Sequence, residues 1–194
     1  MDEELRSLTE RLRQESRGPA AFDRLLATED HDELAEVLTA PGQPLWAREL
    51  VAFRLGVARD RRAFESLVLL LNHRDPPRCA SAAYALARLG DPRTARAAAA
   101  LATNELRVAY ALHPVRLLVE LRAPESVPAL ITTLERRLRP HDPYHRVALS
   151  CVEGLGALAD PRARRVLKEA LAHPVLARAA VRALAGIPEE EQAR

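Results

Sequence analysis

The sequence predicts an all-α fold of stacked helix pairs, and three features support it: the aliphatic composition, a recurring turn phrase, and the spacing of that phrase. Hydrophobic residues make up 48% of the 194 residues, but aromatic residues only 4%. The core is therefore expected to consist mainly of Leu, Val and Ala, which favour helices or pack between closely spaced ones. This composition argues against a β-sandwich, and a chain of this length is expected to form one domain, 1–194.

A phrase that ends one helix and begins the next recurs along the chain. It reads Leu-Gly-Asp-Pro-Arg in its clearest copy, and it occurs at 55–61, 89–93 and 158–162, with a degenerate copy at 121–125. Its aspartate is a preferred N-cap, and its proline suits the first helical position. The successive copies are 31, 32 and 37 residues apart. Such a period is typical of helix pairs that stack into a solenoid.

The apolar pattern on either side of each phrase predicts four helix pairs. First helices are expected at 44–57, 76–89, 105–121 and 144–158, and second helices at 61–72, 92–103, 125–138 and 161–172. Further helices are expected at 2–15, 19–28, 31–39 and 174–186. The domain is thus expected to hold capping helices in 1–40, repeats in 44–186 and a frayed tail in 187–194, because a solenoid needs caps over its terminal apolar faces.

The third pair is expected to be irregular. Its turn phrase lacks the Gly-Asp of the other copies, and Pro114 falls inside its first helix. A proline inside a helix removes a backbone hydrogen bond and kinks the axis. We therefore expect a kink at this residue.

The stretch 75–93 resembles a HEAT-like repeat of the kind found in phycobilisome-lyase-type proteins. In such repeats an Asp-Pro turn, an Ala-rich helix and a Leu-Gly-Asp-Pro joint follow one another. Residues 145–162 are a second good match, and 46–64 and 107–134 are weaker ones. The resemblance implies a right-handed α-α superhelix of the HEAT-like or ARM-like type, whose second helices line the concave side and whose partner, usually a protein, lies along it. It implies a fold and not an activity.

Alignment of the second helices at their joints separates a core face from a surface face. The core face is expected to hold Phe64, Leu67 and Leu71 in the first pair, and Val127, Leu130 and Leu134 in the third. The opposite face is the predicted partner-binding surface. It comprises Arg62, Leu69, His73, Arg93, Arg96, Asn104, Thr132, Arg136, Arg162 and Arg165.

This surface is rich in arginine, whose planar guanidinium suits carboxylates, phosphates and aromatic faces. An acidic segment of a partner protein would fit it. The alternative is that the arginines are solvated or form exposed ion pairs with Glu65, Glu135 and Glu169, each worth about 0–1 kcal/mol. The sequence leaves both interpretations open.

The sequence contains no motif that demands a particular reaction. It has no Gly-rich phosphate loop, no Gly-x-Ser-x-Gly elbow and no His-Glu-x-x-His helix. It also lacks the His-Glu dipeptides that serve as iron ligands in deoxyhypusine hydroxylases, which resemble this class of repeat. His141 and His145 are four residues apart, but Pro143 disfavours a regular helix through both. Cys79 and Cys151 are expected to be buried thiols. We expect no catalytic residue, no metal site and no cofactor.

The expected function is therefore that of a non-catalytic protein-interaction adaptor or regulatory scaffold. DNA binding, as in HEAT-like alkylpurine DNA glycosylases, is one alternative, although the net charge of +2 and the single tryptophan argue against it. A bilin lyase or chaperone role is another, and it requires a large apolar pocket. No apolar run reaches the ~18 residues of a membrane span, so a cytoplasmic protein is expected. The oligomeric state is left open.

Overall fold

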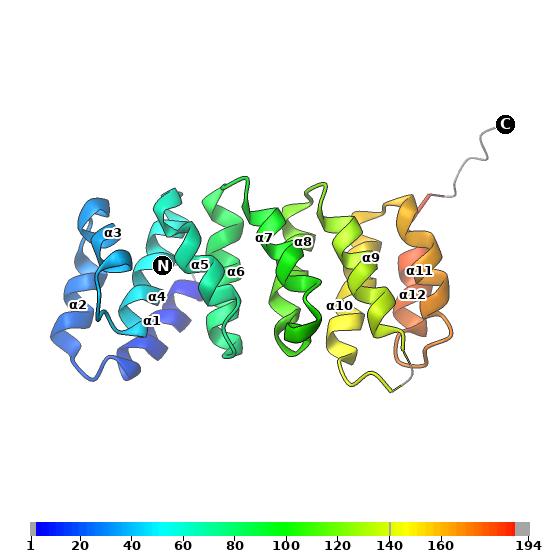
Figure 1. Ribbon diagram of the computed structural model, residues 1–194, viewed down its shortest axis with the longest axis horizontal. Helices are drawn as coiled ribbons and strands as arrows, with labels where there is room; N and C mark the ends of the chain where they lie inside the picture. Colours follow the sequence, from blue (N-terminus) through cyan, green and yellow to red (C-terminus); the bar gives the residue numbers. More distant parts are fainter. Residues whose placement is uncertain (1–2, 140, 189–194) are drawn as a thin grey trace. The chain divides into compact units, whose positions relative to one another are not determined.

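The computed structural model describes residues 3–139 and 141–188, and every regular element in these residues is helical (Figure 1). The α-helices are α1 (Glu3–Glu15), α2 (Pro19–Ala27), α3 (His31–Thr39), α4 (Leu45–Val57), α5 (Phe64–Leu71), α6 (Pro76–Leu89), α7 (Thr94–Ala102), α8 (Leu112–Leu121), α9 (Ser126–Arg137), α10 (His145–Leu158), α11 (Arg164–Ala170) and α12 (Ala177–Ala185). Short 3₁₀ segments, η1 (Arg61–Ala63), η2 (Glu105–Tyr110) and η3 (Pro161–Ala163), precede α5, α8 and α11. The helix positions predicted from the sequence are confirmed, with the third first helix divided in two. Of the predicted tail, residues 189–194 lie outside the described residues.

The packing divides the chain into two compact units, one up to Thr94 and one from Ala95 onward. In the first unit, α4 is central and packs against α1, α2, α3, α5 and α6. In the second unit, α10 packs against α8, α9 and α12, and α11 packs against α9 and α12. Each unit is therefore built from packed helix pairs, as expected of a HEAT-like repeat array.

The apolar face predicted for the second helices is buried in both units. In the first unit, Phe64, Leu67 and Leu71 are at most 6% exposed. In the second unit, Val127, Leu130 and Leu134 are at most 6% exposed. Full burial of a Leu or Val side chain stabilises a fold by roughly 1.5–3 kcal/mol, so this face holds each second helix against its neighbours.

Each turn phrase places one residue in the left-handed backbone conformation one or two positions after the end of the first helix. These residues are Arg59, Gly90, Arg122 and Ala159, with φ angles of 63°, 68°, 49° and 53°. Glycine adopts this conformation without steric cost, whereas a residue with a Cβ atom is strained in it. The same backbone turn thus ends all four first helices, although only one copy of the phrase contains the glycine that suits it.

The residue after this turn caps the next helix. The carboxylates of Asp60, Asp91 and Asp160 each accept a hydrogen bond from the backbone N–H two residues on, at 3.1, 2.9 and 2.9 Å. The third phrase has Ala123 at this position. There the hydroxyl of Ser126 accepts from the Ala123 N–H at 3.1 Å and donates to a carbonyl at the end of α8. The Ser126 side chain therefore ties this joint to the end of α8 in the absence of the aspartate.

The first helix of the third pair is broken before Pro114 rather than kinked at it, which corrects the predicted kink. Residues 105–110 form a 3₁₀ segment in which Arg107 is not helical (φ −125°, ψ 19°), and α8 begins at Leu112. Pro114 consequently lies in the first turn of α8. Backbone N–H groups there have no acceptor within the helix, so the proline ring removes no hydrogen bond.

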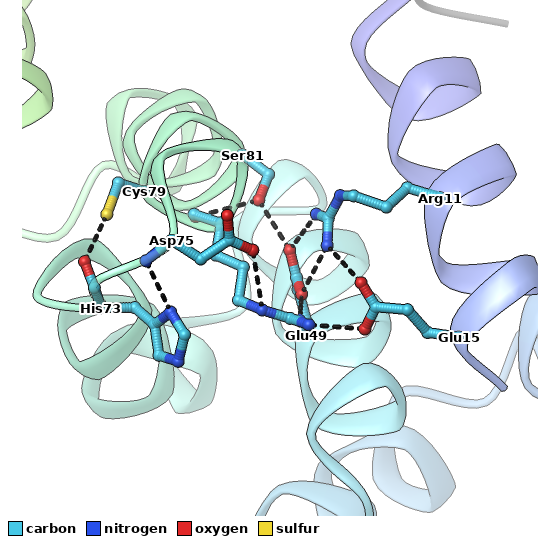
Figure 2. Close-up of polar contacts among 8 residues, drawn as sticks. Arg11, Glu15, Glu49, His73, Asp75, Cys79 and Ser81 are labelled. Atoms are coloured by element: carbon cyan, nitrogen blue, oxygen red, sulfur yellow. Dashed lines mark hydrogen bonds and ion pairs between the residues drawn. The ribbon is translucent and has the colours of Figure 1, made fainter.

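A buried ion-pair network joins α1 to α4 and α6 in the first unit (Figure 2). Glu49 on α4 is 1% exposed, and its carboxylate accepts hydrogen bonds from Arg11 on α1 and Arg78 on α6. The Ser81 hydroxyl also donates to Glu49, at 3.0 Å, and Arg78 pairs with Glu15 on α1 at 2.5 Å. One carboxylate therefore links three helices that are far apart in the sequence.

Replacement of Glu49 by glutamine is expected to lower the free energy of unfolding by about 3 kcal/mol, because two arginines would keep their charges in a partly buried site without this carboxylate. Urea unfolding followed by circular dichroism measures the change. The matched control is Glu65→Gln, since the Glu65 side chain is 78% exposed and pairs with an exposed arginine. The control should change stability by no more than about 0.5 kcal/mol. Equal effects of the two substitutions would show that the buried network does not hold α1.

The left-handed turn after α10 predicts opposite effects for the same substitution at two nearby alanines. Ala159→Gly should raise the free energy of unfolding by about 0.5–1 kcal/mol, because it relieves the strain at φ 53°. Ala157→Gly, at an exposed position within α10, should lower it by about 1 kcal/mol through lost helix propensity. Chemical unfolding of both variants checks the prediction, and destabilisation by Ala159→Gly would contradict it.

Candidate protein-interaction surface

Three of the predicted binding arginines fold back onto the joint that precedes them. Arg62, Arg93 and Arg162 each donate side-chain hydrogen bonds to both oxygens of the capping aspartate two residues earlier. These hydrogen bonds lower the pKa of each aspartate below its ordinary value. The arginines therefore stabilise the turn that starts each second helix, in addition to any role toward a partner.

Four of the predicted arginines also pair with an acidic side chain about one repeat earlier. Three of these pairs join residues 28 to 30 positions apart, which is close to the repeat period. The pairs are Arg62–Asp32, Arg93–Glu65, Arg136–Glu105 and Arg165–Glu135. Glu65 and Glu135 thus pair with these arginines, and Glu169 pairs with Arg165 at 2.9 Å, so all three acidic residues considered in the alternative interpretation form ion pairs, worth about 0–1 kcal/mol for each exposed pair.

The other predicted residues of the second unit have separate positions. Arg96 is exposed on α7 and forms no ion pair with the described residues. The Asn104 side chain accepts from the Leu106 N–H at 3.0 Å and so caps the 3₁₀ segment before α8. Thr132 is half-buried on α9. Asn104 is thus engaged in local structure, whereas Arg96 is open to solvent.

The first unit has an apolar depression at α3, α4 and α5, neighbouring helices in Figure 1. Its volume is about 190 Å³. Leu69 on α5 is 73% exposed and Leu45 at the start of α4 is 42% exposed, so both present apolar surface to solvent. The depression is lined by Leu38, Leu45, Arg48, Ser66, Leu69, Leu70 and His73. It brings together Leu69 and His73 of the predicted surface.

The polar lining of this depression consists mainly of hydrogen-bond donors. Arg48 donates through Nη2 to the Ala40 carbonyl at 3.0 Å, while its Nε–H is buried without an acceptor among the described residues. His73 accepts through Nδ1 from the Asp75 N–H at 3.0 Å (Figure 2), which assigns its proton to Nε2. The sequence reasoning missed Leu38, Leu45 and Arg48, because it considered only the second helices. Leu45, an apolar residue directly after a Pro-Gly-Gln-Pro turn, was the available signal.

The second unit has a broader, shallow hollow at α7 and α9, with a volume of about 460 Å³. The small side chains of α7, which carries four consecutive alanines, leave this space. The hollow is lined by Ala99, Pro124, Glu125, Pro128, Ala129 and Thr132. Of the predicted surface residues, it includes Thr132.

The described residues hold no cluster of three or more His, Cys, Asp or Glu side chains that could bind a metal ion. Cys79 and Cys151 are both buried, as predicted, and burial raises the pKa of the Cys151 thiol well above its usual range. A thiol in this state is protonated and a poor nucleophile. Within the described part of the chain, no helix is both long enough and apolar enough to span a membrane.

The clasp between Asp91 and Arg93 predicts a pH-dependent contribution to stability. The hydrogen bonds from Arg93 lower the Asp91 pKa below the ordinary value of 3.8, so the unfolded chain binds this proton more readily. The carboxylate thus contributes stability that is fully present above pH 3.8 and is lost as pH falls through the folded pKa. In urea unfolding, the stability difference between wild type and Asp91→Asn should be largest near neutral pH and shrink in acid. A pH-independent difference would contradict this.

The comparison with protein families agrees with the repeat geometry. A model of the PBS lyase HEAT-like repeat matches residues 147–173, which include most of α10, the Asp160 cap and all of α11. No curated protein matches the chain. The matched stretch contains a first helix, a left-handed turn, a capping aspartate and a second helix, in the order that the sequence predicts. Residues 147–173 are therefore a PBS lyase HEAT-like repeat.

Proposed function

We propose that this protein is a non-catalytic protein-interaction module, an adaptor or regulatory scaffold, that binds its partner through the outward faces of the second helices. The HEAT-like repeat supports this class of function, although it points to no particular partner. The single observation that carries the proposal is the apolar depression beside α5. Leu69 is 73% exposed there, on the helix face that the sequence assigns to a partner.

An exposed leucine beside an apolar depression has a physical reason to bind. Leu38 and Leu70, which line the same depression, are at most 9% exposed, so a partner side chain placed there would contact an existing apolar surface. Burial of apolar surface contributes about 25 cal/mol per Å². Binding energy at protein interfaces is concentrated in such central apolar anchors, with polar residues around them.

The ion-paired arginines have a secondary role in this proposal. Arg62, Arg93, Arg136 and Arg165 already pair with carboxylates, so their charges are largely neutralised before a partner arrives. They would orient a partner at the rim more than they would attract it. The same pairing weighs against DNA binding, since phosphate contacts would require these arginines to exchange their carboxylate partners.

A bilin lyase or chaperone role is less well supported than protein binding. Pockets for ligands of that kind measure about 300–1,000 Å³ and enclose most of the ligand. The apolar depression of the first unit, at about 190 Å³, is smaller, and the larger hollow of the second unit is shallow.

Substitution of Leu69 by aspartate tests the proposal. We expect Leu69→Asp to reduce recovery of a specific partner protein by at least about tenfold, or about 1.4 kcal/mol, because binding would bury a carboxylate where the wild type buries an apolar side chain. Quantitative mass spectrometry after affinity capture from a lysate of the source organism measures recovery. Val181→Asp is the matched control, because Val181 is 58% exposed on α12 and does not line the depression.

Both variants should keep the wild-type circular dichroism spectrum and unfolding midpoint, since the two positions are exposed. Loss of the same partner from Leu69→Asp alone would support the proposal. Equal recovery by Leu69→Asp and wild type would exclude the depression as the binding site.

A further inference from the structure

We infer that the partner inserts one large apolar side chain into the depression of the first unit and places a neighbouring carboxylate against Arg48 and His73. This inference rests on the proposed function and specifies the chemistry of the partner. It concerns a peptide segment in which an aromatic or branched aliphatic residue stands next to an acidic one.

The size of the depression sets the apolar part of the ligand. An apolar cavity of about 150 Å³ lined by residues such as Leu holds one benzene molecule. The depression, at about 190 Å³, is larger by a small margin, and four leucines contribute to its lining. It therefore accommodates a single Phe or Leu side chain, and not a helix or a whole chromophore.

The charged and polar residues that line the depression indicate which polar group the ligand carries. No lining residue is acidic, whereas Arg48 and His73 both carry donors. Arg48 is only partly exposed and forms no ion pair with the described residues, and one of its N–H groups lacks an acceptor. This Nε–H is buried, but the Nη groups carry N–H donors besides the one given to Ala40, and a guanidinium without a carboxylate partner in a partly desolvated place favours a carboxylate.

Arg48 differs in this respect from four of the six arginines that the sequence singled out. Arg62, Arg93, Arg136 and Arg165 each have a carboxylate partner about one repeat earlier. A partner carboxylate would have to displace an existing one at those positions, whereas at Arg48 it would meet an unneutralised charge. The acidic group of the partner is therefore expected at Arg48.

His73 supplies a second donor at the same depression. Its Nδ1 accepts from the Asp75 N–H, so its Nε2 carries the proton in the neutral ring and can donate it to an acceptor. The hydrogen bond to Asp75 also fixes the ring orientation. Arg48 and His73 thus present donors from α4 and from the end of α5 toward one ligand.

Methyl NMR of the full chain with short peptides tests the inference. The probes are N-acetyl-Phe-Asp-amide, its isosteric partner N-acetyl-Phe-Asn-amide, and N-acetyl-Ala-Asp-amide. We expect the Phe-Asp probe to shift the Leu38, Leu45 and Leu69 methyl resonances and to bind about tenfold more tightly than the Phe-Asn probe. The Ala-Asp probe should produce no saturable shift, because it lacks the side chain that fills the depression.

Two variants test whether Arg48 binds the carboxylate of the Phe-Asp probe. Arg48→Gln should abolish the preference for Asp over Asn, whereas Arg96→Gln, at an exposed arginine of the second unit without an ion pair, should retain it. Arg48 also holds the Ala40 carbonyl, so His73→Gln provides a second variant that should reduce the preference if Arg48→Gln fails to fold.

Equal affinity for the Asp and Asn probes, or no saturable shift with Phe-Asp, would overturn the inference. The proposed function would stand if Leu69→Asp still lost its partner in the capture experiment, so the two failures are distinguishable. Shifts of the same methyl resonances on raising the protein concentration alone would assign the depression to a second copy of the chain, and would likewise overturn the inference.

Discussion

The left-handed turn at the end of each first helix is the constraint on which the rest of the structure depends. It reverses the chain within a few residues, so that the apolar face of the second helix returns to the first, and it places a cap residue at the start of the second helix. Glycine, arginine and alanine all occupy the turn, which shows that helix packing outweighs a local strain of about 1–3 kcal/mol. The positions of the surface residues follow from this turn.

Arginine in these repeats serves first to join one repeat to the next. Arg93 clasps its own capping aspartate and also reaches Glu65 on the preceding second helix. Arg165 similarly reaches Glu135 in the second unit. A surface on which most arginines are matched in this way has a weaker field than its arginine content suggests. Specific recognition then depends on places where the matching is incomplete, and Arg48 marks such a place.

Much of the fold could be predicted from the sequence, because turn phrases and apolar periodicity are local signals. The candidate site could be predicted only in part. Leu69 and His73 follow from the alignment of second helices, but the depression that they share is completed by residues of α3 and α4. The pairing of Arg11 with Glu49, across 38 positions, likewise leaves no local pattern. The helix breaks before Pro114 because proline costs little free energy in the first turn of a helix. In the interior of a helix it removes a hydrogen bond and clashes with the preceding turn.

The buried carboxylate of Glu49 restricts how this protein can change over evolutionary time. A substitution at Glu49, Arg11 or Arg78 alone removes one charge from a partly buried network that joins three helices, so single steps away from the network are expected to destabilise the protein. Replacement of every member of a buried ion-pair network by well-packed apolar residues of similar volume is often neutral or stabilising. The network residues on α1, α4 and α6 are therefore expected to change together in evolution. Exposed residues on the second helices can change one at a time.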